Sequence, residues 1–177
     1  MNTLIFDTET TDLVKTSLMT VDKQPHIIEF YGCVIDDDGN LVEELEQLIH
    51  PGFEITPDTT RMTGITRDML SAAPRAAVAM PAILNLIEHS DRVVAHNLSF
   101  DKAMVDIEAK RLNTVVEWPD YQTCTVEASL FYKGFRLNLT SLHEHLLGVA
   151  FTGAHRAKID VMALTRCFIE MRKKGDV

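Results

Sequence analysis

The chain has 177 residues, of which 46% are hydrophobic, and its formal net charge is −9. This length and composition predict one domain over residues 1–177 with a substantial buried core. The negative charge disfavours extensive binding to duplex nucleic acid, which depends on many Lys and Arg contacts to phosphates. It therefore limits the size of any nucleic-acid contact without excluding a small one.

No apolar run approaches the ~18 residues of a membrane span, and no basic segment followed by a hydrophobic one opens the chain. Cys33, Cys124 and Cys167 are odd in number and widely spaced. This spacing favours reduced thiols over a disulfide framework or a zinc site. We therefore expect a cytoplasmic protein with no membrane contact.

The N-terminal part of the chain is predicted to form strands. Residues 3–6 and 26–35 are rich in β-branched and aromatic side chains, as strands are. Residues 36–40 predict a tight turn, after which residues 41–49 return as a third strand, although their glutamates also permit a helix. Residues 50–58 are expected to be a loop.

The remainder is predicted to be mainly helical, with one buried strand at residues 92–97. Thr66 is placed to cap a helical turn through residue 70, and Pro81 indicates a kink or boundary within residues 76–88. The predicted helices cover residues 76–88, 99–112, 126–131, 141–147 and 157–173. Strands in a hairpin followed by alternating strands and helices predict an α/β fold with a mixed sheet.

Two acids directly follow the first predicted strand. Asp7 and Glu9 are two residues apart, and alternate residues of a strand point to the same side. Two carboxylates held that close repel each other unless a proton or a cation lies between them. The first motif therefore raises the possibility of a cation site.

Two further polar clusters occur later in the chain. His96 to Asp101 lie where the strand at 92–97 passes into a helix, a common place for ligand sites in α/β sheets. His155 and Asp160 are five residues apart, about 140° net around a helix, so they cannot share one helical face. We therefore expect His155 on a loop and Asp160 inside the last helix.

Each cluster alone has an ordinary structural explanation, such as a helix-start acid or a surface Arg156 to Asp160 pair. Together they supply four acids at strand ends or helix starts. Oxygen ligands in that number favour hard cations such as Mg²⁺ or Mn²⁺, and two such ions suit displacement at a phosphodiester. The four acids are Asp7, Glu9, Asp101 and Asp160.

The three motifs, in this order, resemble those of the DEDDh branch of 3′→5′ exonucleases, the DnaQ-like family that includes proofreading exonucleases of bacterial replicative polymerases. The resemblance spans nearly the whole chain and includes the segment at residues 62–66, "MTGIT". It implies a ribonuclease H-like fold, with a mixed central β-sheet flanked by α-helices. It also implies hydrolysis from 3′ ends with release of nucleoside 5′-monophosphates.

The resemblance further implies a role for each matching position. Two Mg²⁺ or Mn²⁺ ions would be held by Asp7, Glu9, Asp101 and Asp160, with Asp7 bridging them and His155 acting as general base. The terminal nucleotide would be surrounded by the residues near Thr8, Thr10, Leu13, Ile65 and Phe100. Of these, Leu13, Ile65 and Phe100 offer apolar surfaces for a base.

Two residues depart from the family pattern. Asp12 stands where the family usually has Gly, and a left-handed backbone there would be tolerated by Asp better than by most residues. Lys158 replaces an apolar residue, so it either tilts the last helix or contacts phosphate beside Arg156. Neither position is a predicted metal ligand.

Single-stranded DNA 3′ ends are the expected substrate, because an acidic protein lacks a wide basic surface for holding duplex. An RNA or oligoribonucleotide exonuclease on the same site is the alternative. A catalytically silent nucleic-acid-binding module is less favoured, because all five family positions are filled. The sequence provides no support for association with a polymerase.

Overall fold

A five-stranded sheet in the order β3-β2-β1-β4-β5 forms the centre of the protein. The structure, a computed structural model, describes residues 1–16, 19–153 and 156–177. The strands are β1 (Thr3–Thr10), β2 (Ile27–Ile35), β3 (Leu41–Leu48), β4 (Arg92–Ala95) and β5 (Tyr121–Cys124). The β3-β2-β1 pairs are antiparallel, whereas β1-β4 and β4-β5 are parallel. The predicted mixed α/β sheet is confirmed.

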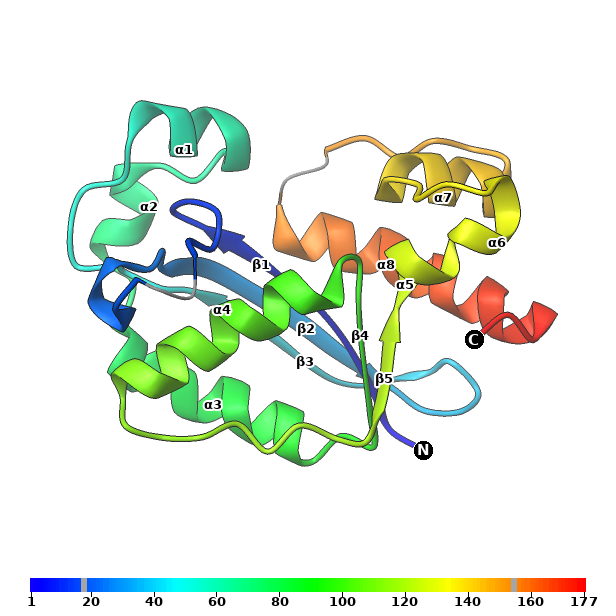
Figure 1. Cartoon of the computed structure of the whole chain (residues 1–177), viewed down its shortest axis with the longest axis horizontal. Coiled ribbons are helices and arrows are strands. Elements are labelled where there is room, and N and C mark those ends of the chain that lie inside the picture. Colours follow the sequence, from blue (N-terminus) through cyan, green and yellow to red (C-terminus); the bar gives the residue numbers. More distant parts are fainter. Residues whose placement is uncertain (17–18, 154–155) are drawn as a thin grey trace.

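Helices surround this sheet (Figure 1). They are η1 (Val21–Lys23), α1 (Pro57–Thr63), α2 (Arg67–Ser71), α3 (Ala76–Glu88), α4 (Leu98–Arg111), α5 (Thr125–Ala128), α6 (Leu130–Lys133), α7 (Leu139–Leu147) and α8 (Ala157–Lys174). No helix in the described ranges is long and apolar enough to span a membrane.

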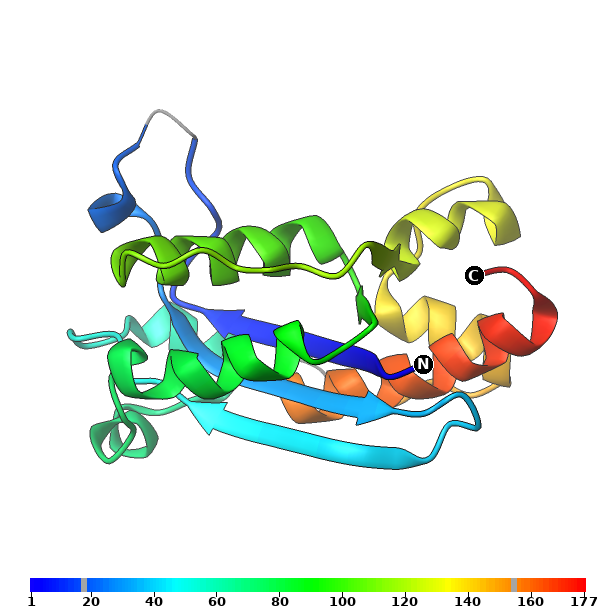
Figure 2. The same cartoon turned by 90° about the horizontal axis from the view of Figure 1, so that it is seen from below.

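Two layers of apolar side chains form because alternate residues of each strand point to opposite faces of the sheet. Leu4 and Phe6 of β1 are fully buried in a core shared with α3 and α4. Ile5 is buried on the other face, against Val161 and other residues of α8. Figures 1 and 2 show α3 and α4 side by side and α8 apart from them, next to α7. This alternation decides which face each later residue of β1 occupies.

Most predicted elements are confirmed with small shifts at their ends. Residues 41–48 form a strand, and the turn before it is closed by Gly39 N donating to the Asp36 carbonyl at 3.1 Å. Thr66 caps α2, since its Oγ1 accepts from Met69 N at 3.3 Å. The helix at 76–88 continues through Pro81, so Pro81 is not a helix boundary.

Three element predictions were wrong. The loop predicted at 50–58 ends early, because Thr56 caps α1 and Pro57 occupies a position at its start that suits proline. Strand β5 was missed, because its short sequence YQTC lies on a sheet edge and is partly exposed. The single helix predicted at 126–131 is two short helices, α5 and α6, that meet at Ser129.

Candidate active site

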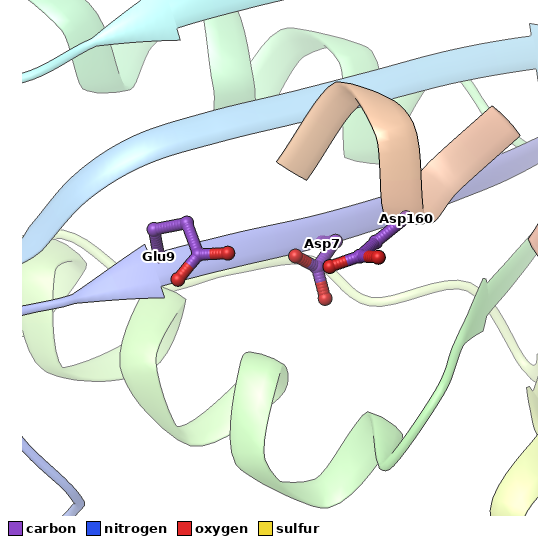
Figure 3. A group of neighbouring side chains, drawn as sticks. All are labelled: Asp7, Glu9 and Asp160. Carbon is purple, nitrogen blue, oxygen red and sulfur yellow. The ribbon is translucent and has the colours of Figure 1, made fainter. Parts of the chain in front are cut away.

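Three carboxylates meet on the face of the sheet covered by α8. Asp7 and Glu9 follow Ile5 at two-residue intervals along β1, so they point to the same face as Ile5. Asp160 lies in the first turn of α8. One carboxylate oxygen from each residue lies within 4.8 Å of the others, and Figure 3 shows the three side chains converging from β1 and α8. The sequence prediction placed these three acids at one site.

The fourth predicted acid, Asp101, approaches from the opposite face. It is 2% exposed, in the first turns of α4. Its Oδ1 accepts from Thr8 N at 3.1 Å and from Thr8 Oγ1 at 2.7 Å. Because Thr8 lies between Asp7 and Glu9 in β1, Asp101 is fixed beside the strand that carries two of the other acids. Among the described residues, Asp101 is not part of the group of Asp7, Glu9 and Asp160, whose carboxylate oxygens lie within 4.8 Å of one another.

The unequal lengths of β1 and β4 explain how Asp101 reaches this place. Only Thr3, Leu4 and Ile5 of β1 pair with β4, so the rest of β1 extends past the end of that parallel neighbour. The chain then turns through Asn97, whose φ of 81° is left-handed, a conformation that Asn tolerates better than most residues. Helix α4 therefore begins beside the extended half of β1.

Burial favours the uncharged forms of Asp7, Glu9 and Asp101, and repulsion between carboxylates adds to this effect for Asp7 and Glu9. The pKa of Asp7 is raised well above its ordinary value by burial and then by the carboxylates of Asp101, Glu9 and Asp160. Burial, followed by repulsion from neighbouring carboxylates, raises the pKa of Glu9 to about 8. Burial raises the pKa of Asp101 to about 7, against the hydrogen bonds from Thr8, which lower it.

Such a cluster fits divalent cations. Its donors are all carboxylate oxygens, which hard ions such as Mg²⁺ and Mn²⁺ prefer. A cation between the carboxylates would also remove the repulsion that raises their pKa values. The residues present therefore fit the metal ions that the sequence motifs imply.

A cavity of about 560 Å³ opens beside the acids. Four of the five predicted nucleotide contacts line it, namely Thr8, Thr10, Leu13 and Phe100, and Leu13 is 73% exposed. Its complete lining is Thr8, Glu9, Thr10, Thr11, Asp12, Leu13, Thr56, Asp58, Thr59, Met62, Thr63 and Phe100. Glu9 thus borders a space in which a small polar ligand can contact both hydroxyl and apolar groups.

Ile65 does not line this cavity. Its side chain is fully buried and packs with Ile28 and Leu70 in a separate core cluster. The prediction that Ile65 offers an apolar surface to a base is therefore corrected for the side chain. Met62 lies on the cavity wall instead and is 66% exposed. Ile65 was assigned to the nucleotide site from the family resemblance of its segment, and that resemblance does not reveal which side chain of the segment faces the core.

His155 lies outside the described residues. The chain is described again from Arg156, which is the N-cap residue of α8. Arg156 donates to Glu29, with its Nη2 2.7 Å from Oε1. The predicted placement of Asp160 inside the last helix is confirmed.

Glu29 was missed by the sequence analysis although it is fully buried. The signal was available, because Glu29 is an acid within β2, where all nine residues are buried. An ionisable side chain in such a strand requires a charged or hydrogen-bonding partner. Here the partner is Arg156, 127 residues later in the chain.

The two departures from the family pattern are now explained locally. Lys158 Nζ lies 2.7 Å from Glu46 Oε2, so Lys158 forms an ion pair with the edge strand β3. Among described residues other than glycine, positive φ occurs at Asn97 and Asn113, so Asp12 does not adopt a left-handed backbone. The Asp12 side chain instead accepts a hydrogen bond from Leu13 N at 2.8 Å.

Comparison with known proteins gives consistent results. A family model described as Exonuclease (RNase_T) matches residues 4–168. A DNA polymerase III PolC-type protein of Thermotoga petrophila is 32% identical over 176 residues, which cover 97% of this chain and 12% of that protein. The corresponding protein of Caldanaerobacter subterraneus subsp. tengcongensis is 29% identical over 171 residues, which cover 97% of this chain and 12% of that protein. The chain thus spans about an eighth of these relatives.

Solved structures share the fold. The nuclease domain of 3'hExo, a DEDDh family member bound to rAMP, has a TM-score of 0.78 and 16% identity, with 98% of this chain and 92% of that one covered. Exonuclease X in complex with 5′-overhanging duplex DNA has a TM-score of 0.68 and 22% identity, with 98% and 93% covered. The predicted ribonuclease H-like fold is confirmed. The chain belongs to the RNase_T exonuclease family, in agreement with the predicted resemblance to DnaQ-like exonucleases.

Proposed function

We propose that the protein removes nucleotides one at a time from the 3′ end of single-stranded DNA, releasing nucleoside 5′-monophosphates with the help of two Mg²⁺ or Mn²⁺ ions. The observation that carries this proposal is the convergence of Asp7, Glu9 and Asp160 beside Asp101, at the edge of a cavity. We further propose that residues 1–177 form a single exonuclease domain, consistent with the match over residues 4–168.

The carboxylates have separate positions and hence separate tasks. Asp7 interacts with each of the other three acids, since Asp101, Glu9 and Asp160 each raise its pKa, after the larger effect of burial. It would touch both ions, with Glu9 and Asp160 completing the shell of one and Asp101 serving the other. When bound, such a pair of ions stabilises the attacking and leaving oxygens of an in-line displacement.

His155 would act as general base. It immediately precedes Arg156, the N-cap of the helix that carries Asp160. Histidine is suited to this task because its ordinary pKa lies near neutral pH. In this role it would take the proton from the water that attacks the terminal phosphodiester.

The cavity would hold the terminal nucleotide. Leu13 and Phe100 provide apolar surface on which a base can rest, together with Met62. Thr10, Thr56 and Thr59 also line the cavity, and they would supply polar contacts to the nucleotide. The main chain around Ile65 remains part of the proposed contact, whereas its side chain does not.

DNA is favoured over RNA by the sequence relatives, whose names identify them as DNA polymerase III. The fold itself does not discriminate, because one structural neighbour carries duplex DNA and another carries rAMP. The preference for single strands follows from the formal charge of −9, which limits the basic surface available for holding a duplex.

Matched oligonucleotides test this proposal. We would compare 5′-labelled single-stranded DNA, RNA of the same sequence, and blunt duplex DNA at moderate salt, with Mg²⁺ or Mn²⁺ and with EDTA. The expected result is stepwise shortening of single-stranded DNA from its 3′ end that stops in EDTA and on a 3′-blocked strand. Faster degradation of RNA than of DNA would make RNA the preferred substrate. Full activity in EDTA after dialysis would contradict a metal-dependent mechanism.

A further inference from the structure

An ion pair between the buried Glu29 and the partly exposed Arg156 links the start of α8 to the sheet next to the carboxylates. Glu29 is fully buried, and its carboxylate accepts from Arg156 Nη2 at 2.7 Å and from Arg156 Nε at 3.2 Å. Its other oxygen accepts from Ala157 N at 3.0 Å and from the same Nε at 3.2 Å. One carboxylate therefore receives both a forked guanidinium and a main-chain N–H of the helix.

The strand register places this pair beside the carboxylates. Glu29 is directly opposite Glu9 in the antiparallel β1-β2 pair. Like Glu9, it lies on the face of the sheet that packs against α8, because Tyr31 and Cys33 at the next alternate positions of β2 belong to that packed layer. The pair is thus formed on the same face, and at the same level of the sheet, as the proposed metal ligands.

Helix α8 depends on this contact for its cap. Its N-cap residue is Arg156, whose side chain makes no capping hydrogen bond and has no acceptor oxygen, unlike the Ser, Thr, Asp or Asn that usually stand there. The carboxylate of Glu29 accepts from the first helical N–H instead and places a negative charge at the positive end of the helix. The cap comes from β2, so it also fixes where the helix begins relative to the sheet.

We infer that Glu29 and Arg156 form a latch, here called the Glu29–Arg156 latch, that positions the first turn of α8 so that Asp160 meets Asp7 and Glu9. Both are positioning residues. The inference rests on the proposed function, because it concerns the acids that would hold the metal ions of the proposed exonuclease. Without the latch, the start of α8 would lose the hydrogen bonds that Arg156 and Ala157 N donate to Glu29 of β2, and Asp160 would be held less firmly beside β1.

The Arg156 side chain also passes close to the turn after α1. A Cβ atom added at Gly64 would lie 3.9 Å from Arg156 Cδ. Gly64 directly follows Met62 and Thr63, which line the cavity. The latch therefore lies next to the turn that follows one wall of the proposed nucleotide site.

The Arg156→Met variant distinguishes a positioning role of Arg156 from a purely electrostatic one, because the two roles predict opposite changes in the affinity for a metal ion. The substitution removes a positive charge near the acids, and by charge alone the acids should then bind a cation more tightly. Loss of the latch should instead weaken binding, by at least about tenfold, as is typical when a group supporting a metal ligand is removed. The measurement is the dissociation constant for Mn²⁺ by electron paramagnetic resonance, without nucleic acid.

Lys158→Met is the matched control. It makes the same change two residues later, in the same turn of α8, but its partner Glu46 is on the exposed edge of the sheet. We expect Mn²⁺ binding within about twofold of wild type, since exposed ion pairs contribute little. Arg156→Lys, which keeps the charge and loses the forked geometry, should recover part of the affinity.

Hydrogen exchange measures the latch without metal. Backbone amides of residues 157–161 should exchange at least about tenfold faster in Arg156→Met than in wild type, whereas Lys158→Met should show no such change. If Arg156→Met does not fold, the same increase is expected in Arg156→Lys. Unchanged or tighter Mn²⁺ binding in a folded Arg156→Met protein, or unchanged exchange at 157–161, would overturn the latch. Wild-type protein that binds Mn²⁺ but shows no nuclease activity would reject the proposed function and leave this test intact. If wild type binds no Mn²⁺, the exchange result alone decides the latch.

Discussion

Two strands of the same sheet carry closely spaced acids, and only one of them forms a candidate site. Edge strand β3 carries Glu43, Glu44 and Glu46, all exposed. Strand β1 carries Asp7 and Glu9, both partly buried at its carboxyl end. In the sequence, both runs are acids at short spacing after apolar residues, so neither pattern alone identifies the functional one.

The difference lies in what faces each run. Glu44 accepts from the Tyr31 hydroxyl and Glu46 pairs with Lys158, so these two acids have neutral or cationic partners at the protein surface. Asp7 and Glu9 instead face a third carboxylate, Asp160, on α8. Asp7 and Glu9 are partly buried and repel Asp160, so the charged site is stabilised only by a bound proton or cation. The acids of β3 are exposed, and solvation is sufficient to stabilise their charges.

The largest expected effect is on turnover in Asp7→Asn. Removing the central carboxylate should reduce the rate on single-stranded DNA on the order of 10³-fold, because charge stabilisation at the reacting phosphate is lost. Calorimetry should show that most Mn²⁺ binding is lost as well. The equivalent acid-to-amide change on the edge strand, Glu43→Gln, should leave the rate within about twofold. Equal losses in the two variants would mean that the two acidic strands do not differ in function.

A second variant tests whether the carboxylates act alone. His155→Ala should turn over at least about a hundredfold more slowly, because positioned bases typically contribute ~10²–10⁴-fold. Binding of Mn²⁺ and of a 3′ end should persist, since the four acids remain. Single-turnover kinetics would measure the chemical step without interference from product release, and a near-normal rate would remove His155 from the mechanism.

The smallest expected effect is on thermal stability. The pKa of Glu9 is raised from 4.5 to about 8, so the folded protein holds this proton more tightly than the unfolded chain does. Stability from the protonated form is fully present below pH 4.5 and is lost as the pH rises through about 8. In EDTA at pH 9, Glu9→Gln should therefore be more stable than wild type by at least about 1 kcal/mol, about 2–4 °C in Tm.

That difference should shrink towards pH 5, and Mg²⁺ should stabilise wild type more than the variant, because a ligand of the folded state raises Tm. Scanning calorimetry from pH 5 to 9 with and without Mg²⁺ measures both effects. A Tm difference independent of pH would show that the side-chain change alters packing rather than relieving charge repulsion.

The sequence by itself determined four of the five strands, the hairpin and the long helices, because hydrophobic periodicity and caps are local signals. It also determined that Asp7 and Glu9 share one face, since alternation within a strand requires no knowledge of the rest of the fold. It did not reveal β5 or the start of α1, where short, partly exposed segments carry little periodicity.

Only the tertiary structure decided which partners those residues meet. The burial of Ile65 in a core with Ile28 and Leu70, and the pairing of Glu29 with Arg156, join segments far apart in the chain. Asp101 likewise meets a distant segment. It reaches β1 because β4 pairs only with the first part of β1, and α4 begins beside the unpaired part. Such contacts depend on how strands and helices pack against one another in space, and no local pattern along the chain contains that information.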